Sequence, residues 1–457
     1  MSTAEPHPDL PTQQRPQQRP QPRPGPGPSQ PRPGPGPSWP VRRLFPILGT
    51  IGLIIFGMAG TIWGPRYYGN SVWALPDDLW ATMTAAQRLL HLHLGGLYTA
   101  PTNLVSFPGA AVILVPIAAL LDAAGLPLHA GRQPAHPAEW LLIGPYTVVI
   151  SSVALFAVDA LAERLGLSRP KRFLLAAASA TALWNPTIRW GHPEDAVATG
   201  LLLYGILALS KSKTARAAWL VGAAVAVQPL VLLAVPLLIA VLEPRRIAGF
   251  LARAAAPSVV LLAAAAAANW HATITAVTKQ PNWPAVDHPT PWLFLAPRLG
   301  NGTVAAGPAR TLAVVVACLC ALFVAIRWRT SRPDRTAPEW ATEELARVLW
   351  WTAVALALRC VFESVMVSYY VWPALAVALI TGSRNWPRLL ATGTVAVTLT
   401  FVAQSSWRNP WAFWAPITGL LCLALLFAGA WPARSRSRPQ SQPDAVMTLD
   451  PSPETLS

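Results

Sequence analysis

The chain has 457 residues, of which 53% are hydrophobic and only 12% are charged. Soluble domains carry about 25% charged residues, and many apolar runs here approach the length of a membrane span, so the composition predicts an all-α polytopic membrane protein. The net charge of +15 does not indicate a nucleic-acid partner, because the basic residues form short clusters between apolar runs, as cytoplasmic loops of membrane proteins do.

A proline-rich segment opens the chain. Residues 1–40 contain 14 prolines together with Gln, Arg, Gly and Ser. This composition predicts a disordered cytoplasmic tail over residues 1–43, either simply solvated or binding an SH3-like partner. The segment is too polar for a signal peptide, so we expect the first apolar run, 44–63, to remain as a membrane anchor.

The stretch that follows this anchor predicts an amphipathic helix outside the cytoplasm. One face is apolar, and the opposite face carries a carboxylate, an arginine and a histidine. The apolar face is formed by Leu79, Met83, Ala86, Leu90 and Leu97, and the polar face by Asp77, Thr84, Arg88 and His91. Adjacent carboxylates at the start of such a helix suggest a reaction site; the simpler alternative is that Asp77 or Asp78 caps the helix.

The next apolar segment, 104–122, is interrupted by Pro108 and Pro116. A full crossing here would place the basic cluster at 164–172 outside the cytoplasm. We therefore predict a re-entrant or interfacial segment, whose non-helical backbone must be covered by protein or line a water-filled cavity.

Eleven further spans are predicted, which gives about twelve in all and places both termini in the cytoplasm. They are 139–161, 172–187, 195–210, 215–228, 229–242, 247–268, 309–327, 345–360, 369–381, 388–404 and 411–431. The pair 215–242, broken at Gln228-Pro229, is alternatively one kinked hairpin. With this topology 26 of the 35 Lys and Arg residues are cytoplasmic, as the positive-inside rule requires. The membrane domain is thus 44–431, and 432–457 is a second disordered cytoplasmic tail.

Side chains suited to chemistry gather in the predicted outer loops and at the outer ends of spans. They are Asp77, Asp78, Arg88, His91, Tyr98, His192, Glu194, Asp195, Asp287, His288, Arg359, Glu363, Tyr369 and Tyr370. The predicted spans themselves hold few charges, whereas ion-coupled transporters carry ionisable groups at mid-membrane. This pattern favours a site at the outer membrane surface over a conduction path.

Two of these groups also have simpler interpretations. His192, Glu194 and Asp195 are typical of a helix start, where acidic residues are favourable. Arg359 and Glu363 are four residues apart, so they can pair with each other on a helix.

The order of these features resembles the GT-C class of integral-membrane glycosyltransferases, and most of all the actinobacterial mannosyltransferases that use a polyprenyl-phosphate sugar donor. The motifs that carry the resemblance, over roughly 44–385, are Asp77-Asp78, Gly95-Gly96-Leu97-Tyr98, Ser106-Phe107-Pro108, Gly191-His192-Pro193-Glu194-Asp195, Gly222 to Gln228-Pro229-Leu230, and Tyr369-Tyr370-Val371-Trp372-Pro373. Two positions depart from the family pattern: Gly109 stands where a second proline is usual, and Gln228 where a lysine is usual.

The resemblance implies an inverting sugar transfer at the outer face of the cell membrane. An outer-loop carboxylate, Asp78 first and Asp77 second, would be the general base. Positive charge for the leaving lipid phosphate would come from Arg88, Arg359 or a histidine. We expect no metal and no cofactor.

The resemblance also implies the substrates and the roles of the remaining residues. The donor would be a polyprenyl-phosphate sugar, with mannose and arabinose both open, and the acceptor a lipid, a glycan or a protein. His192, Glu194 and Asp195 would orient the acceptor or assist the base, and Asp287 and His288 would line the cleft. The alternatives are a flippase or transporter for lipid-linked sugars, and a non-catalytic scaffold that recruits partners through its tail.

Overall fold

The structure is a computed structural model that describes residues 38–63, 76–100, 102, 104–126, 128, 137–331, 339–404 and 409–429. The chain divides into two units, Met1–Arg42 and Arg43–Ser457. The described part of the first unit contains one short helix, α1 (Trp39–Arg42). Most of the predicted N-terminal tail and all of 432–457 lie outside the described residues.

The second unit consists almost entirely of helices over its described residues. The α-helices are α2 (Leu44–Trp63), α3 (Asp77–Leu90), α4 (Pro108–Val112), α5 (Val115–Ala123), α6 (Pro137–Ser151), α7 (Val153–Arg164), α8 (Arg169–Trp184), α9 (Pro193–Ser210), α10 (Thr214–Val227), α11 (Val235–Ala240), α12 (Pro244–Ala268), α13 (Trp270–Thr278), α14 (Gly307–Ser331), α15 (Thr342–Val361), α16 (Trp372–Gly382), α17 (Trp386–Val402) and α18 (Pro410–Ala428). Short helical turns are η2 (Leu94–Gly96), η3 (Asn185–Arg189), η4 (Pro229–Ala234), η5 (Leu293–Leu295) and η6 (Ser368–Val371).

Four short strands form two antiparallel pairs in this unit. β1 (His288–Pro289) pairs with β4 (Val365–Met366), with His288 opposite Met366. β2 (Arg298–Gly300) pairs with β3 (Thr303–Val304) as a small hairpin. The first pair matters for the site because it joins the loop before α14 to the segment after α15.

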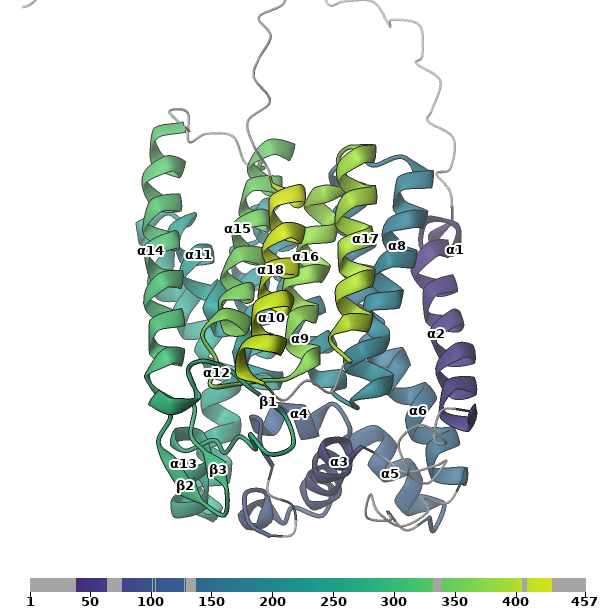
Figure 1. The fold of residues 1–457 in the computed structure, drawn as a ribbon, viewed down its shortest axis with the longest axis vertical. Helices are drawn as coiled ribbons and strands as arrows, with labels where there is room; N and C mark the ends of the chain where they lie inside the picture. Colours follow the sequence, from purple (N-terminus) through teal and green to yellow (C-terminus); the bar gives the residue numbers. More distant parts are fainter. Residues whose placement is uncertain are drawn as a thin grey trace, which may run out of the picture. The chain divides into compact units, whose positions relative to one another are not determined.

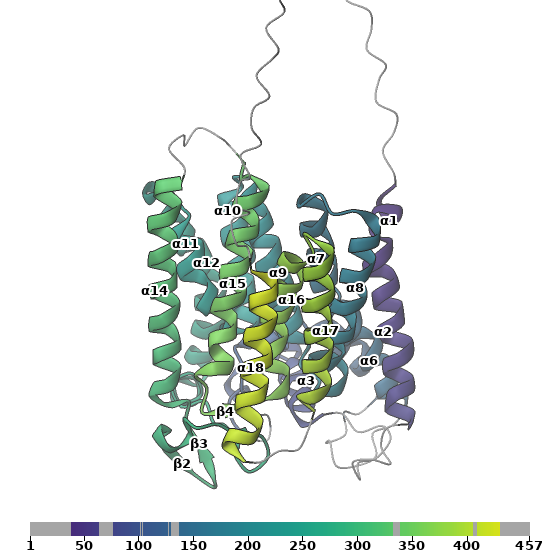
Figure 2. The same ribbon diagram turned by 45° about the horizontal axis from the view of Figure 1, so that its top comes forward.

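Four of the described helical segments are long and apolar enough to cross a membrane: Trp140–Arg164, Pro244–Ala268, Gly307–Thr330 and Pro410–Ala428. These segments identify an all-α membrane protein. In Figure 1, α14, α15, α18 and α17 run along the bundle, and α3, α4, α5 and α13 lie at its lower end. Figure 2 shows α14, α15, α17 and α18 again, with the loop strands β2, β3 and β4 below them.

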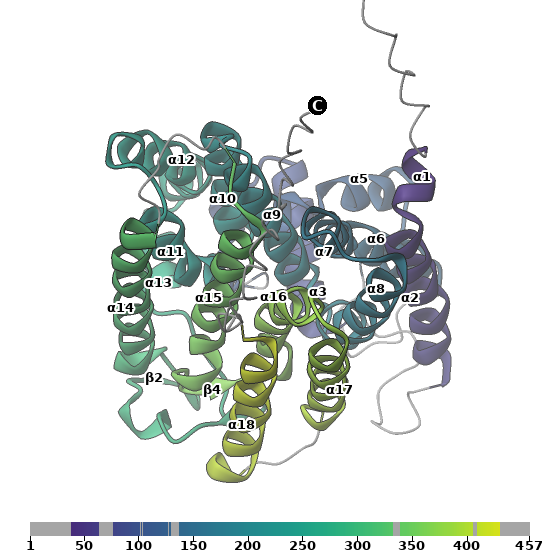
Figure 3. The same cartoon turned by 90° about the horizontal axis from the view of Figure 1, so that it is seen from above.

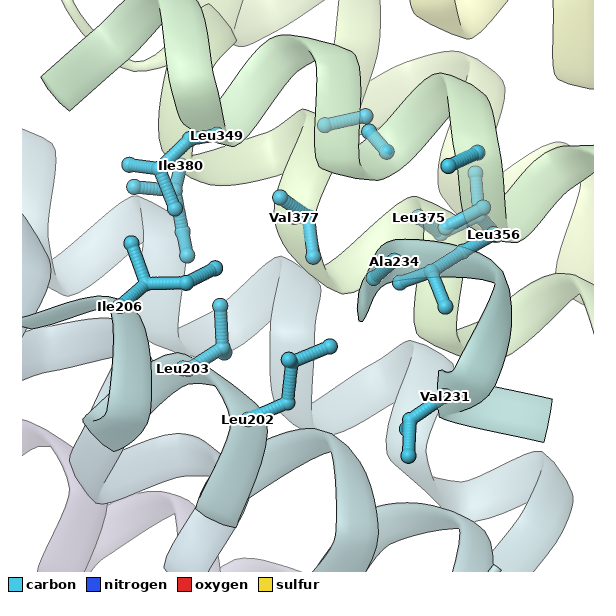
Figure 4. Close-up of a cluster of buried hydrophobic side chains, with 14 of the residues drawn as sticks. Leu202, Leu203, Ile206, Val231, Ala234, Leu349, Leu356, Leu375, Val377 and Ile380 are labelled. Atoms are coloured by element: carbon cyan, nitrogen blue, oxygen red, sulfur yellow. The ribbon is translucent and has the colours of Figure 1, made fainter. Parts of the chain in front are cut away.

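The largest apolar core joins helices that are far apart in the sequence. In Figure 4, side chains from α9, η4, α15 and α16 converge, and their contacts hold these four elements together. The labelled residues are Leu202, Leu203, Ile206, Val231, Ala234, Leu349, Leu356, Leu375, Val377 and Ile380, all buried. At its edge, a Cβ on Gly222 would lie 2.6 Å from the Ala254 carbonyl oxygen, so α10 and α12 pack backbone to backbone, as small residues allow in membrane bundles. Seen from above, α12 and α14 lie on one side of this unit and α2 on the other (Figure 3).

The predicted amphipathic helix is α3. Leu79, Met83 and Ala86 are fully buried, and Leu97 beyond the helix end is 1% exposed. This face packs against α4 and α5. The predicted apolar face is therefore confirmed for these four residues, and the fifth, Leu90, is only partly buried. Because Pro76 is the N-cap residue and Asp77 and Asp78 are the first two residues of the helix, the alternative that Asp77 or Asp78 is its N-cap is wrong.

The segment predicted to be re-entrant folds as two short helices, α4 and α5, at the same end of the unit as α3 (Figure 1). α4 is pressed against the end of α10, since a Cβ on Gly109 would lie 2.2 Å from the Ala226 carbonyl oxygen. The Tyr146 hydroxyl donates to the Ile113 carbonyl at the break between α4 and α5 (2.7 Å). Protein thus covers the broken backbone, as the prediction required.

Candidate active site

A tight turn before α9 brings the second acidic motif onto α3. Gly191 has φ of +68°, and a Cβ there would lie 2.8 Å from the Leu79 Cβ, so this turn needs glycine both for its backbone and for its closeness to α3. The turn places His192, the N-cap residue of α9, next to Asp78, which is the second residue of α3. Two segments 114 residues apart meet here.

The His192 ring bridges two carboxylates. Its Nε2 lies 2.9 Å from Asp78 Oδ2, and its Nδ1 lies 2.7 Å from Glu194 Oε1. The ring also stacks on Tyr369, with centroids 3.9 Å apart. An ionised carboxylate can only accept a hydrogen bond, so the protonated imidazole, with two N–H donors, satisfies both contacts.

Electrostatics in this cluster favour that charged form. Burial acts to lower the pKa of His192, but the negative charges and hydrogen bonds of Glu194 and Asp78 outweigh it and hold the pKa well above its usual value. Partial burial acts to raise the pKa of Asp78, yet the His192 hydrogen bond and charge leave it below its usual value. Asp78 is therefore ionised at neutral pH.

The two carboxylates differ in access. The Asp78 side chain is 53% exposed, whereas the Glu194 side chain is 5% exposed. Asp78 can thus meet a substrate, and Glu194 serves as a buried partner that orients His192.

Asp195 is held by Gln228, the residue between α10 and η4. Gln228 donates from Nε2 to Asp195 Oδ1 (2.7 Å). The Ser106 hydroxyl, just before α4, donates to Gln228 Oε1 (3.4 Å), and the Tyr98 hydroxyl donates to the Ser106 carbonyl (3.2 Å). This chain of contacts ties α9 to the broken segment through the extended residue between α10 and η4.

A second charged group lies at the end of α15. The Arg359 guanidinium lies 3.7 Å from the ring centre of Tyr370, and its Nε is 3.8 Å from Glu363 Oε2. Arg310, near the start of α14, donates to the same Glu363 oxygen from Nη2 (3.0 Å) and to Gln280 from Nη1 (2.9 Å). Arg359 also interacts electrostatically with Asp195, which connects this group to the His192 cluster. The simple Arg359–Glu363 pair is therefore incomplete without Arg310.

The loop before α14 contributes the third part of the site. Burial and the charge of Asp78 raise the pKa of Asp287 to about 6, against the opposing charge of His192, so Asp287 lies within electrostatic reach of both. The neighbouring His288 ring stacks on Phe413 with centroids 3.6 Å apart. Strand pairing of His288 with Met366 fixes this loop beside η6, which carries Tyr369.

Three predicted site residues lie elsewhere. Arg88 donates to the Gly96 carbonyl beyond the end of α3 (2.6 Å). The exposed His91 ring lies 3.8 Å from the exposed Asp122. Tyr98 reaches the cluster only through its bond to Ser106. The side chain of Asp77 lies outside the described residues.

Sequence reasoning missed Arg310, Gln280 and Ser106 as partners of the site. Arg310 carried a usable signal, because it is a cation at the predicted outer end of an apolar span, and Ser106 belongs to one of the motifs that carry the resemblance. The contacts of Gln280 and Ser106 depend on the packing of distant segments.

Three buried carboxylate oxygens of this region accept no hydrogen bond from any described residue: Glu194 Oε2, Asp195 Oδ2 and Glu363 Oε1. Buried acceptors normally have a donor, so these three oxygens are unsatisfied polar atoms inside the cluster. Over the same residues, no group of three or more His, Cys, Asp or Glu side chains has the arrangement of a metal site.

Comparison with known proteins adds no relative. No family model matches the chain, and no curated protein matches it. The class defined by the fold is an all-α membrane protein with a cluster of carboxylates, histidine and arginines at one end of its helices.

Proposed function

We propose that the protein is a membrane glycosyltransferase that moves a sugar from a polyprenyl-phosphate donor to an acceptor hydroxyl at the outer face of the cell membrane. The observation that supports it best is the half-exposed Asp78 carboxylate held by the buried His192–Glu194 pair. This arrangement is that of a general base with a fixed orientation.

In this proposal Asp78 accepts the proton of the acceptor hydroxyl while that oxygen attacks the anomeric carbon. The bond from this carbon to the phosphate oxygen breaks, and the lipid phosphate leaves with the electron pair. One displacement inverts the anomeric configuration. His192 and Glu194 hold the carboxylate in place and do not touch the substrate.

The leaving phosphate needs nearby positive charge, which Arg359 and Arg310 supply. Arg359 was expected for this role, as was Arg88, whose Nη1 donates to the Gly96 carbonyl. Charge-assisted hydrogen bonds from arginine suit phosphate oxygens well.

The sugar itself fits the buried acceptor atoms. The unpartnered oxygens of Asp195 and Glu363 can accept hydrogen bonds from sugar hydroxyls. Tyr369 interacts electrostatically with Asp78, Asp195 and Asp287, and we propose that Tyr369 and Asp287 also contact the sugar. We propose mannose as the sugar, with arabinose as the second choice.

The test is sugar transfer in membranes that contain the wild type, Asp78→Asn, Asp77→Asn or Asp122→Asn, with radiolabelled polyprenyl-phosphate mannose and then the arabinose donor. We expect Asp78→Asn to lose at least about 100-fold in rate, because the acceptor proton has no base. Asp122→Asn is the matched control, since it neutralises an exposed acid at the same end of the unit and should leave the rate unchanged. Transfer that survives in Asp78→Asn removes the proposed base, and wild-type membranes silent with both donors would refute the proposed function.

A further inference from the structure

Helix α13 presents an exposed apolar face. Trp270, Ile274 and Val277 are 67%, 38% and 43% exposed. Their spacing of four and three residues places them on one face of the helix. We call these three residues the α13 stripe.

The position of α13 relative to its neighbours is fixed by one residue. Asn269 separates α12 from α13, and its side chain accepts from the Ala272 amide in the first turn of α13 (3.1 Å). The same side chain donates to the Gly95 carbonyl in the loop after α3 (3.2 Å). α13 is thus tied both to the end of α12 and to the segment that follows the helix carrying Asp78.

The stripe follows directly after a candidate span. α12 is one of the four helices long enough to cross a membrane, and its outward side chains Leu251, Val259 and Val260 are 41%, 59% and 65% exposed. Only Asn269 lies between this helix and the stripe. Figure 1 shows α13 at the lower end of the bundle.

We propose that the α13 stripe docks onto the surface of the lipid bilayer, at the boundary between head groups and acyl chains. Trp270 has the side chain that membrane proteins favour at this depth, and α13 contains no Asp, Glu, Lys or Arg. The exposed Lys279 follows directly and suits lipid phosphates. The position of the stripe directly after a candidate span favours lipid over a partner protein or a second copy.

Docking of this kind has a consequence for the rest of the molecule. The Asn269–Gly95 bond connects the stripe to the loop after α3, so lipid contact at α13 helps to hold α3 at the membrane surface. This inference does not depend on the proposed sugar transfer.

The experiment places a fluorescent probe on the stripe and on a matched site of the same helix. In the full-length chain with its four cysteines replaced by alanine, Ile274→Cys and Thr275→Cys are labelled separately with a bimane probe. Thr275 is also exposed but lies about 100° around the helix from Ile274. Each protein is reconstituted in phosphatidylcholine nanodiscs, with or without bromine atoms on the upper acyl carbons.

We expect brominated lipid to quench the Ile274 probe at least about twofold more than the Thr275 probe. Equal quenching at both positions, or no quenching at Ile274, overturns the proposal. A blue-shifted but unquenched Ile274 probe also overturns it, because protein rather than lipid then covers the stripe. If the cysteine-free chain does not fold, a photo-crosslinking residue at Ile274 or Thr275 of the native chain gives the same decision: phospholipid captured only from position 274 supports docking, and capture of protein or of nothing contradicts it.

Discussion

At the scale of single residues, His192 is the group whose charge depends most on its neighbours. Its ring is 10% exposed and lies between Asp78 and Glu194. Because those carboxylates raise its pKa on folding, the charged ring adds stability that is fully present below the unfolded pKa of about 6.5 and is lost as the pH rises through the higher folded value.

This dependence gives a pH prediction. The difference in thermal midpoint between the detergent-solubilised wild type and His192→Gln should be largest near pH 6 and should shrink as the pH rises above 6.5. Glu194→Gln removes one of the two charges that raise the folded pKa of His192, so its loss of stability should also begin near pH 6.5 but should be smaller and should level off at a lower pH than in the wild type. A wild-type advantage over His192→Gln that grows with pH would mean that the ring is neutral in the folded protein.

Asp78 and Glu194, which contact the same histidine, have different proposed roles because their exposure differs. Both bond to the same imidazole, yet one carboxylate is half-exposed and the other is buried. Exposure, which depends on how α3 lies against α9, decides which of them can meet a substrate. No property of the two side chains alone would separate them.

At the scale of elements, the short helix α4 is held against α10 by the absence of a side chain. Gly109→Ala would bring a Cβ to 2.2 Å from the Ala226 carbonyl oxygen, and backbone atoms must shift to relieve the clash. We expect a destabilisation of about 1–3 kcal/mol, measured as a lower thermal midpoint. Gly52→Ala in α2 is the control, because nothing lies within 4 Å of its added Cβ, and its midpoint should stay within error. Equal midpoints for the two variants would show that α4 is free to move away.

A buried ion cluster joins α2, α7 and α8. The Asp159 carboxylate is 2% exposed and accepts from Arg43 Nη1 (2.6 Å) and from Arg172 Nε (2.8 Å). Removing its charge takes this carboxylate from two arginine side chains, 14% and 11% exposed, although Arg43 still pairs with Glu163 (2.8 Å).

Asp159→Asn should therefore destabilise the protein by about 3–5 kcal/mol. The measurement is the loss of monodisperse protein on heating in detergent. Glu243→Gln, which breaks only exposed pairs with Arg245 and Arg246, should change nothing measurable. Equal loss of monodisperse protein for Asp159→Asn and Glu243→Gln would show that the Asp159 cluster contributes no more stability than an exposed ion pair.

At the scale of the whole molecule, charge is distributed unevenly along the second unit. The ion pairs Arg43–Asp159, Arg164–Glu339 and Arg384–Glu343 involve the start of α2, the end of α7 and the segments next to α15 and α16. These elements lie at the upper end of the bundle in Figure 1, and the candidate active site lies at the lower end with α3. Clusters of arginine mark the cytoplasmic side in membrane proteins, which favours an outer site.

Topology reporters test this orientation. Alkaline phosphatase fused after residue 290 should be active, because that loop is predicted to lie outside. Green fluorescent protein fused after residue 331 or at the C-terminus should fluoresce, because both positions are predicted to be cytoplasmic. The reverse pattern would show that the predicted orientation is wrong and that the Asp78 cluster faces the cytoplasm.

Much of the secondary structure could be predicted from local sequence. Each predicted span coincides with a helix or with two consecutive helices, since long apolar runs and proline breaks act over a few residues. The break at Gln228-Pro229 is an example, because Gln228 is extended and η4 begins at Pro229. The apolar face of α3 followed from helical periodicity in the same way.

The site could be predicted only as a set of residue types. The sequence by itself determined that acids, a histidine and arginines lie at the predicted outer ends of apolar segments. It could do so because composition and periodicity are local properties of the chain. The tertiary structure decided that His192 meets Asp78 across 114 residues, that Arg310 reaches Glu363, and that Arg88 turns away to Gly96. These contacts follow from the packing of helices on one another, and packing depends on residues that are far apart along the chain.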